Sequence, residues 1–73
     1  MRYNVNQYLV DTELGSVNKV KTFQVETEED IIEYFEKEEY FLLDTYDDET
    51  KVFYADIPNA HLQEQLVVTE LYR

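Results

Sequence analysis

The sequence predicts an α+β fold, in which an antiparallel sheet of four to five strands, in the order ββαββ(β), packs one helix on one face. Stretches rich in β-branched and aromatic residues recur along the chain, and its single glycine and single proline fall between them. One central segment instead has apolar residues at helical spacing. A length of 73 residues allows a single domain, residues 1–73.

The first two strands are predicted at residues 3–11 and 17–25. Residues 12–16 between them carry Gly15 and are typical of a hairpin turn. Because successive side chains of a strand alternate between faces, we expect Val17 to share a face with Phe23 and Val25, and Val20 to lie on the other.

The helix is predicted to follow Thr27, whose hydroxyl is a suitable N-cap, and the acidic residues after it suit the positive end of the helix dipole. The residues expected on its apolar arc are Ile31, Ile32, Tyr34 and Phe35. Glu38 would fall in the middle of that arc, so the helix should end near Lys37 or Glu38.

A third strand is predicted at residues 40–46, with Phe41, Leu42 and Leu43 as its core, and a fourth at 51–56 after the polar turn 47–50. Pro58 and Asn59 end the fourth strand. Residues 61–65 are compatible with a helical turn, but we favour a final strand through residues 66–72.

The charge balance is the most extreme property of the composition. Seventeen acidic residues against six basic ones give a net charge of −11. Nucleic acid and anionic membranes would repel such a chain, so neither is expected as a direct partner. No apolar leader follows Met1, and no apolar run approaches the roughly 20 residues of a membrane helix, so we expect a cytoplasmic protein.

Few residues are suited to catalysis. His61 is the single histidine, Ser16 is the single serine, and there is no cysteine, so nucleophile–base pairs are nearly unavailable. We therefore expect no enzyme and no cofactor. Residues 44–49 place oxygen ligands close together, but they lack the glycine and alternating spacing of an EF-hand loop. Calcium binding stays a minor alternative, and we predict no metal site.

Acidic residues are gathered in one part of the chain, residues 26–49, where Lys37 is the single base. The twelve are Glu26, Glu28, Glu29, Asp30, Glu33, Glu36, Glu38, Glu39, Asp44, Asp47, Asp48 and Glu49. Helical carboxylates four residues apart lie about 6 Å from each other, which is similar to the spacing of phosphates along a nucleic-acid strand.

We predict such a ladder at Glu29, Glu33 and Glu36, extended by the acidic turn if the hairpin lies beside the helix. The candidate partner-binding residues are Glu29, Asp30, Glu33, Glu36, Glu39, Tyr40, Tyr46, Asp47, Asp48 and Glu49. Two plainer explanations stay open. The acidic residues can be a solvated face that keeps a small protein soluble, or the acidic surface of a halophile's protein.

Small size, strong acidity, an α+β pattern and the lack of catalytic residues together resemble the phage-type DNA-mimic inhibitors. These include inhibitors of the nucleoid protein HU, anti-restriction proteins, anti-CRISPR proteins and uracil-DNA glycosylase inhibitors. The resemblance covers the whole chain but is compositional, and no motif carries over residue by residue.

The resemblance implies that carboxylates occupy the surface that a basic nucleic-acid-binding protein uses for phosphates. An HU-like nucleoid protein is slightly favoured as the partner, and a nuclease, a repair glycosylase or RNA polymerase stay open. The alternative is a structural or regulatory module that binds through a sheet edge or a Tyr/Phe surface. An unpaired outer strand would also allow a homodimer.

Overall fold

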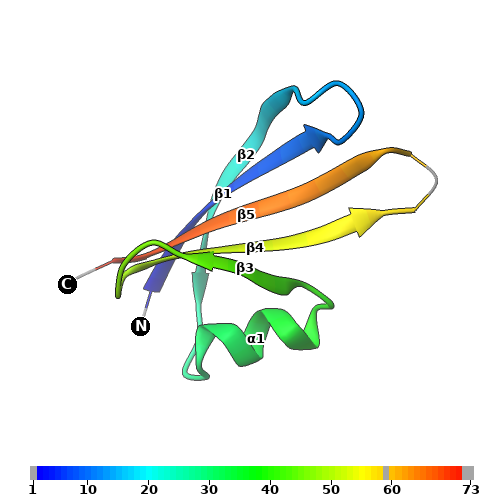
Figure 1. Cartoon of the computed structure of the whole chain (residues 1–73). Helices are drawn as coiled ribbons and strands as arrows, with labels where there is room; N and C mark the ends of the chain where they lie inside the picture. The colour runs from blue at the N-terminus through cyan, green and yellow to red at the C-terminus, as the bar shows by residue number, and fades with distance from the viewer. Residues whose placement is uncertain (1, 59, 72–73) are drawn as a thin grey trace.

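The computed structural model describes residues 2–58 and 60–71 and has the predicted α+β fold (Figure 1). Its elements are β1 (Arg2–Asp11), β2 (Val17–Glu26), α1 (Ile31–Lys37), β3 (Phe41–Thr45), β4 (Thr50–Ile57) and β5 (Leu62–Leu71). The strands form one antiparallel sheet in the order β2-β1-β5-β4-β3. β2 and β3 are therefore its two outer strands.

The first hairpin turns where the sequence predicts it. The Asp11 side chain accepts hydrogen bonds from the backbone amides of Glu13 (2.9 Å) and Leu14 (2.8 Å). The Gly15 amide donates to the Asp11 carbonyl at 2.7 Å, with Gly15 at a φ of +77°. A left-handed backbone of this kind favours glycine, so the position of Gly15 fixes the turn.

The prediction that Val17 shares a face with Phe23 and Val25 is wrong. β1 pairs regularly along its length, but the partner of Gln7 is Lys21 and that of Tyr8 is Lys19, so Val20 is an extra residue in β2. This β-bulge reverses the alternation of side chains beyond it. Val17 therefore lies on the opposite face of the sheet from Phe23.

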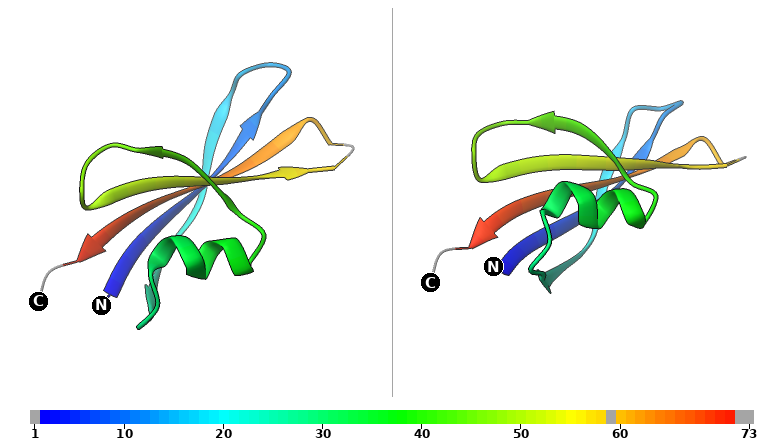
Figure 2. Two further views of the ribbon diagram at one scale, coloured as in Figure 1. Left: turned by 60° about the horizontal axis from the view of Figure 1, so that its bottom comes forward. Right: turned by 90° about the horizontal axis from the view of Figure 1, so that it is seen from below.

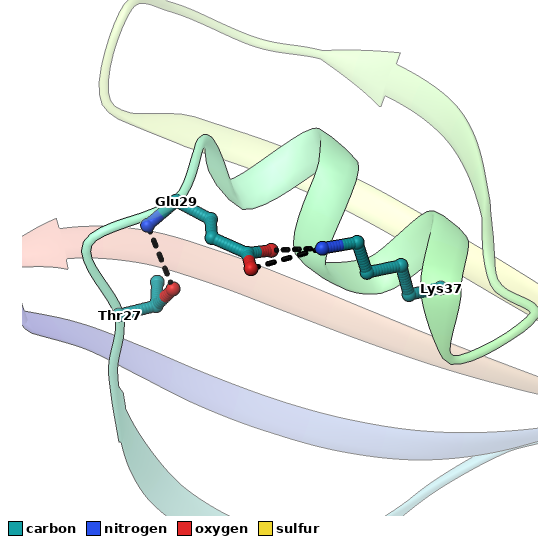
Figure 3. Close-up of polar contacts among 3 residues, drawn as sticks. All are labelled: Thr27, Glu29 and Lys37. Atoms are coloured by element: carbon teal, nitrogen blue, oxygen red, sulfur yellow. Dashed lines mark hydrogen bonds and ion pairs between the residues drawn. The ribbon is translucent and has the colours of Figure 1, made fainter.

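The helix begins later than predicted, and its N-cap is Asp30 rather than Thr27. The Asp30 side chain accepts a hydrogen bond from the Ile32 amide at 2.8 Å. The Thr27 hydroxyl accepts one from the Glu29 amide at 3.0 Å and so stabilises a turn before the helix (Figure 3). α1 ends at Lys37 as predicted, and Glu39, at a φ of 67°, redirects the chain into β3.

The C-terminal segment is strand from Leu62 onward, so the helical turn considered for residues 61–65 does not form. β5 lies between β1 and β4 and pairs with both along its length. Hydrogen bonding on two sides outweighs the local preference for a turn. Of the predicted break after β4, Pro58 lies in a turn, and Asn59 lies outside the described residues.

The core lies between the sheet and α1, which crosses one face of it (Figure 2). Its fully packed residues are Val5, Phe53, Leu66 and Val68 from the sheet and Ile31 and Phe35 from the helix. The Phe35 and Phe53 rings lie 4.9 Å apart between centroids. A helix of this length is marginal by itself, so these contacts hold it in place. Among the described residues, no helix has the length and apolar character needed to cross a membrane.

Candidate functional site

All twelve acidic residues between positions 26 and 49 are exposed to solvent. Eleven of them lie on α1, on the segments that flank it, on β3 and in the β3–β4 turn, while Glu26 is the last residue of β2 and forms an ion pair with Arg2 at 3.2 Å. β3 contacts α1 and forms an outer edge of the sheet, so these elements make up one side of the molecule (Figure 1). We name the eleven exposed carboxylates other than Glu26 the acidic surface.

Two of the five described basic residues lie at the other edge of the sheet. Lys19 and Lys21 lie on β2, which is separated from β3 by β1, β5 and β4. At about 4.8 Å per strand, the two edges are roughly 19 Å apart across the sheet. The base nearest to β3 within the sheet is Lys51 of β4, which is half-buried and pairs with Thr45. Lys19 and Lys21 are therefore separated in space from the acidic surface, whereas Lys37 and Lys51 lie close to it.

The predicted carboxylate ladder on the helix forms only in part. Glu29 precedes the N-cap of α1, and both of its carboxylate oxygens accept hydrogen bonds from the Lys37 ammonium at 2.9 Å (Figure 3). These hydrogen bonds, together with the charges of Glu29 and Glu33, raise the pKa of Lys37. The ion pair is exposed, so its net stabilisation is small. Glu33 and Glu36 remain exposed on α1 itself.

The acidic turn between β3 and β4 is held by its own carboxylates. The Asp47 side chain accepts hydrogen bonds from the amides of Glu49 and Thr50, both at 2.8 Å. This turn lies toward the same end of the molecule as the start of α1, while the loop after α1, where β3 begins, lies nearer the middle of the molecule (Figures 1 and 2). β3 and the helix run side by side in opposite directions, so the acidic surface extends along both.

The two candidate tyrosines differ in their surroundings. Tyr40 is half-buried, its hydroxyl donates to the Glu64 carboxylate at 3.0 Å, and its ring meets Phe35 edge-on at 5.8 Å. Burial and then the interaction with Glu64 raise the pKa of Tyr40 to about 12. Tyr46 is 70% exposed at the end of β3. Tyr46 is therefore better placed than Tyr40 to contact another molecule.

A set of exposed apolar residues that the sequence pattern did not predict lies within the acidic surface. Phe41, Leu42 and Leu43, expected to be the core of their strand, are 60%, 40% and 50% exposed. They lack cover because β3 is an outer strand with a partner on one side only. The one signal in the sequence that pointed this way is the acidic residues on both sides of the apolar run.

The structure offers no preformed metal centre in residues 2–58 and 60–71, where no three His, Asp or Glu side chains are grouped to hold an ion. The Asp44 and Asp47 carboxylates instead accept hydrogen bonds from nearby backbone amides. The arrangement suits long-range attraction of a basic molecule more than coordination chemistry.

Comparison with known proteins yields no matching family model, no similar curated protein and no similar solved structure.

Proposed function

We propose that this protein binds the nucleic-acid-binding surface of a basic DNA-binding protein and blocks it, acting as a DNA mimic. The observation that carries the proposal is the gathering of exposed carboxylates on α1, β3 and the β3–β4 turn, away from the lysines of β2. An HU-type nucleoid protein is the favoured partner, because a DNA-binding surface that is broad and indifferent to sequence tolerates carboxylates in place of phosphates.

The acidic surface would act first at long range. Carboxylates of one sign on one side of a small molecule attract a basic groove and raise the association rate, most strongly at low ionic strength. Once bound, they occupy the lysines and arginines that otherwise neutralise phosphates, so DNA is excluded. Affinity should therefore fall steeply as salt rises.

A gel-shift competition tests the proposal. Purified HU-type protein is bound to labelled DNA, and the acidic protein is added across a salt series. We expect it to release the DNA at low salt and to lose this effect as salt rises. If it displaces DNA from neither an HU-type protein nor a nuclease, a repair glycosylase or RNA polymerase at low salt, the proposal is wrong.

Charge reversal locates the binding surface. Replacing Glu33, Glu36 and Asp48 with lysine should leave the fold intact, because all three side chains are exposed, and should abolish the competition. The matched comparison uses two single reversals of equal charge change, Glu33→Lys within the acidic surface and, as the control, Glu13→Lys in the exposed β1–β2 turn outside it. An equal loss from the control would show that net charge, rather than its position, governs binding.

The outer strand β2 favours a second candidate function, an interaction module that binds by strand addition. β2 has ten residues, and no other described strand pairs with its outer edge. Affinity of this kind comes from main-chain hydrogen bonds and depends little on salt. Lysines at an edge oppose such pairing, and β2 carries Lys19 and Lys21. Binding that persists at high salt would favour this second function.

A further inference from the structure

The exposed apolar side chains at β3 form a patch inside the acidic surface. The β3 patch consists of Phe41, Leu42, Leu43 and Tyr46, which are 60%, 40%, 50% and 70% exposed. Single exposed apolar residues are common on soluble proteins and need no explanation. Four large ones within six consecutive positions are different, because contiguous exposed apolar surface marks interaction sites.

The β3 patch extends over both faces of the sheet edge. Phe41 lies opposite Tyr54, with the ring centroids 5.8 Å apart, while Leu42 lies opposite Phe53 on the side that packs against α1. The register shift between Leu42 and Asp44 makes Leu43 an extra residue of β3. A partner would therefore meet apolar groups around the rim of the sheet, rather than on one flat face.

The backbone of β3 is poorly suited to pairing with another strand. The strand is short, the bulge at Leu43 interrupts its register, and the Asp44 side chain accepts a hydrogen bond from the Thr45 amide at 2.8 Å. Short length, bulges and charged side chains are the features that keep outer strands from pairing. Recognition at β3 would thus depend on side chains.

Acidic residues border the β3 patch at both ends, with Glu38 and Glu39 before it and Asp44 and Asp47 after Leu43. Glu39 precedes β3 and Asp44 lies near its end, so a carboxylate stands on each side of Phe41, Leu42 and Leu43. Antiparallel contact with β3 of a second copy would bring Glu39 of one copy toward Asp44 of the other. Like charges would repel there, so a second copy is a poor occupant.

We propose that the β3 patch binds a segment of the basic partner that has apolar side chains at its centre and lysine or arginine at both ends. This inference rests on the proposed function and adds to it the chemistry of the bound segment. The carboxylates attract the segment, and the apolar contact supplies short-range affinity that salt does not screen. Apolar anchors inside a charged rim are the usual arrangement of energetically important interface residues.

Two synthetic peptides test this inference. Both have paired lysines at each end, but one has an apolar centre of valine, leucine and phenylalanine and the other has serine and glycine there. We expect the apolar-centred peptide to bind at least about tenfold more tightly by fluorescence anisotropy, with the same salt dependence. Amide chemical shifts of the wild-type protein should change most along β3.

A double variant, Phe41→Ser with Leu43→Ser, should bind the two peptides equally. The matched control is Leu14→Ser, since Leu14 is 81% exposed in the distant β1–β2 turn and should keep the difference (Figure 1). Amide spectra establish that each variant is folded, and the wild-type comparison stands even if the double variant unfolds.

The outcomes separate this inference from the proposed function. Equal affinity of the wild-type protein for both peptides would overturn the role of the β3 patch, while leaving the acidic surface as a binding site for basic partners. A preference that survives in the folded double variant would overturn it as well. If neither peptide binds at low salt, the proposed function fails together with it.

Discussion

Tyr40→Phe tests the polar contact that joins the end of the helical segment to the centre of the sheet. The substitution keeps the ring against Phe35 and removes only the hydroxyl that donates to Glu64 at 3.0 Å. Glu64 also accepts a hydrogen bond from Gln7, so the carboxylate keeps one donor. A hydrogen bond to a charged group contributes about 1.5–3 kcal/mol. Because Tyr40 and Glu64 are only partly buried, we reduce the expected loss of stability to about 1 kcal/mol.

The pH dependence gives this prediction a second measurement. The pKa of Tyr40 is raised to about 12 in the folded protein, from its usual 10.0. The folded state therefore holds the phenolic proton more tightly than the unfolded state does. Its stabilisation is complete below pH 10 and is lost as the pH rises from about 10 to about 12. The stability difference between wild type and Tyr40→Phe should close over that range.

Urea unfolding followed by circular dichroism, at pH 7 and in steps from pH 9 to pH 12, measures both effects. At neutral pH, a loss of about 1 kcal/mol lowers the melting temperature of a domain this size by roughly 4–8 °C. Tyr46→Phe is the control, because that side chain is 70% exposed. A gap between wild type and Tyr40→Phe that stays constant up to pH 12 would refute the reasoning, as would an equal loss in the control.

Three further predictions concern the helix and the charge. Phe35→Ala should lower the free energy of unfolding by about 3–5 kcal/mol, because Phe35 is 3% exposed and packs α1 against Phe53. A loss under about 1 kcal/mol, measured by urea unfolding with circular dichroism, would contradict this packing. Asp30→Ala should cost about 1 kcal/mol as the loss of an N-cap, and Thr27→Ala should cost less in the same urea titration. Equal losses of stability in the two variants would contradict the assignment of Asp30 as the N-cap. Adding sodium chloride should raise the melting temperature, because it screens the repulsion among seventeen acidic residues, and a fall on calorimetry would count against that account.

Local patterns in the sequence predicted most of the secondary structure. The strand-forming runs, the hairpin turn at Gly15 and the end of the helix at Lys37 each follow from a few neighbouring residues. Apart from the N-cap of α1, which is Asp30 rather than Thr27, the errors arose where distant residues decide the outcome. The extra residue Val20 in β2 shows only against the register of β1, and β5 extends back to Leu62 because it pairs on both sides.

In the candidate site, too, some features follow from local sequence and others depend on contacts between distant residues. Acidic residues carry a high cost of burial, so their exposure follows from their chemistry alone. Tyr40 was counted with them, but its hydroxyl bonds to Glu64, 24 positions along the chain, which no local pattern indicates. The apolar run at β3 has the composition of a central strand and would have been buried in one.

The sequence by itself determined a folded, strongly acidic α+β chain with its carboxylates concentrated in one stretch, because charge, turn chemistry and side-chain periodicity are properties of neighbouring residues. The tertiary structure decided the strand order β2-β1-β5-β4-β3, and with it the outer positions of β2 and β3. Strand order depends on pairing between distant segments, so it alone determined that the lysines of β2 lie opposite the acidic surface and that Phe41, Leu42 and Leu43 face solvent.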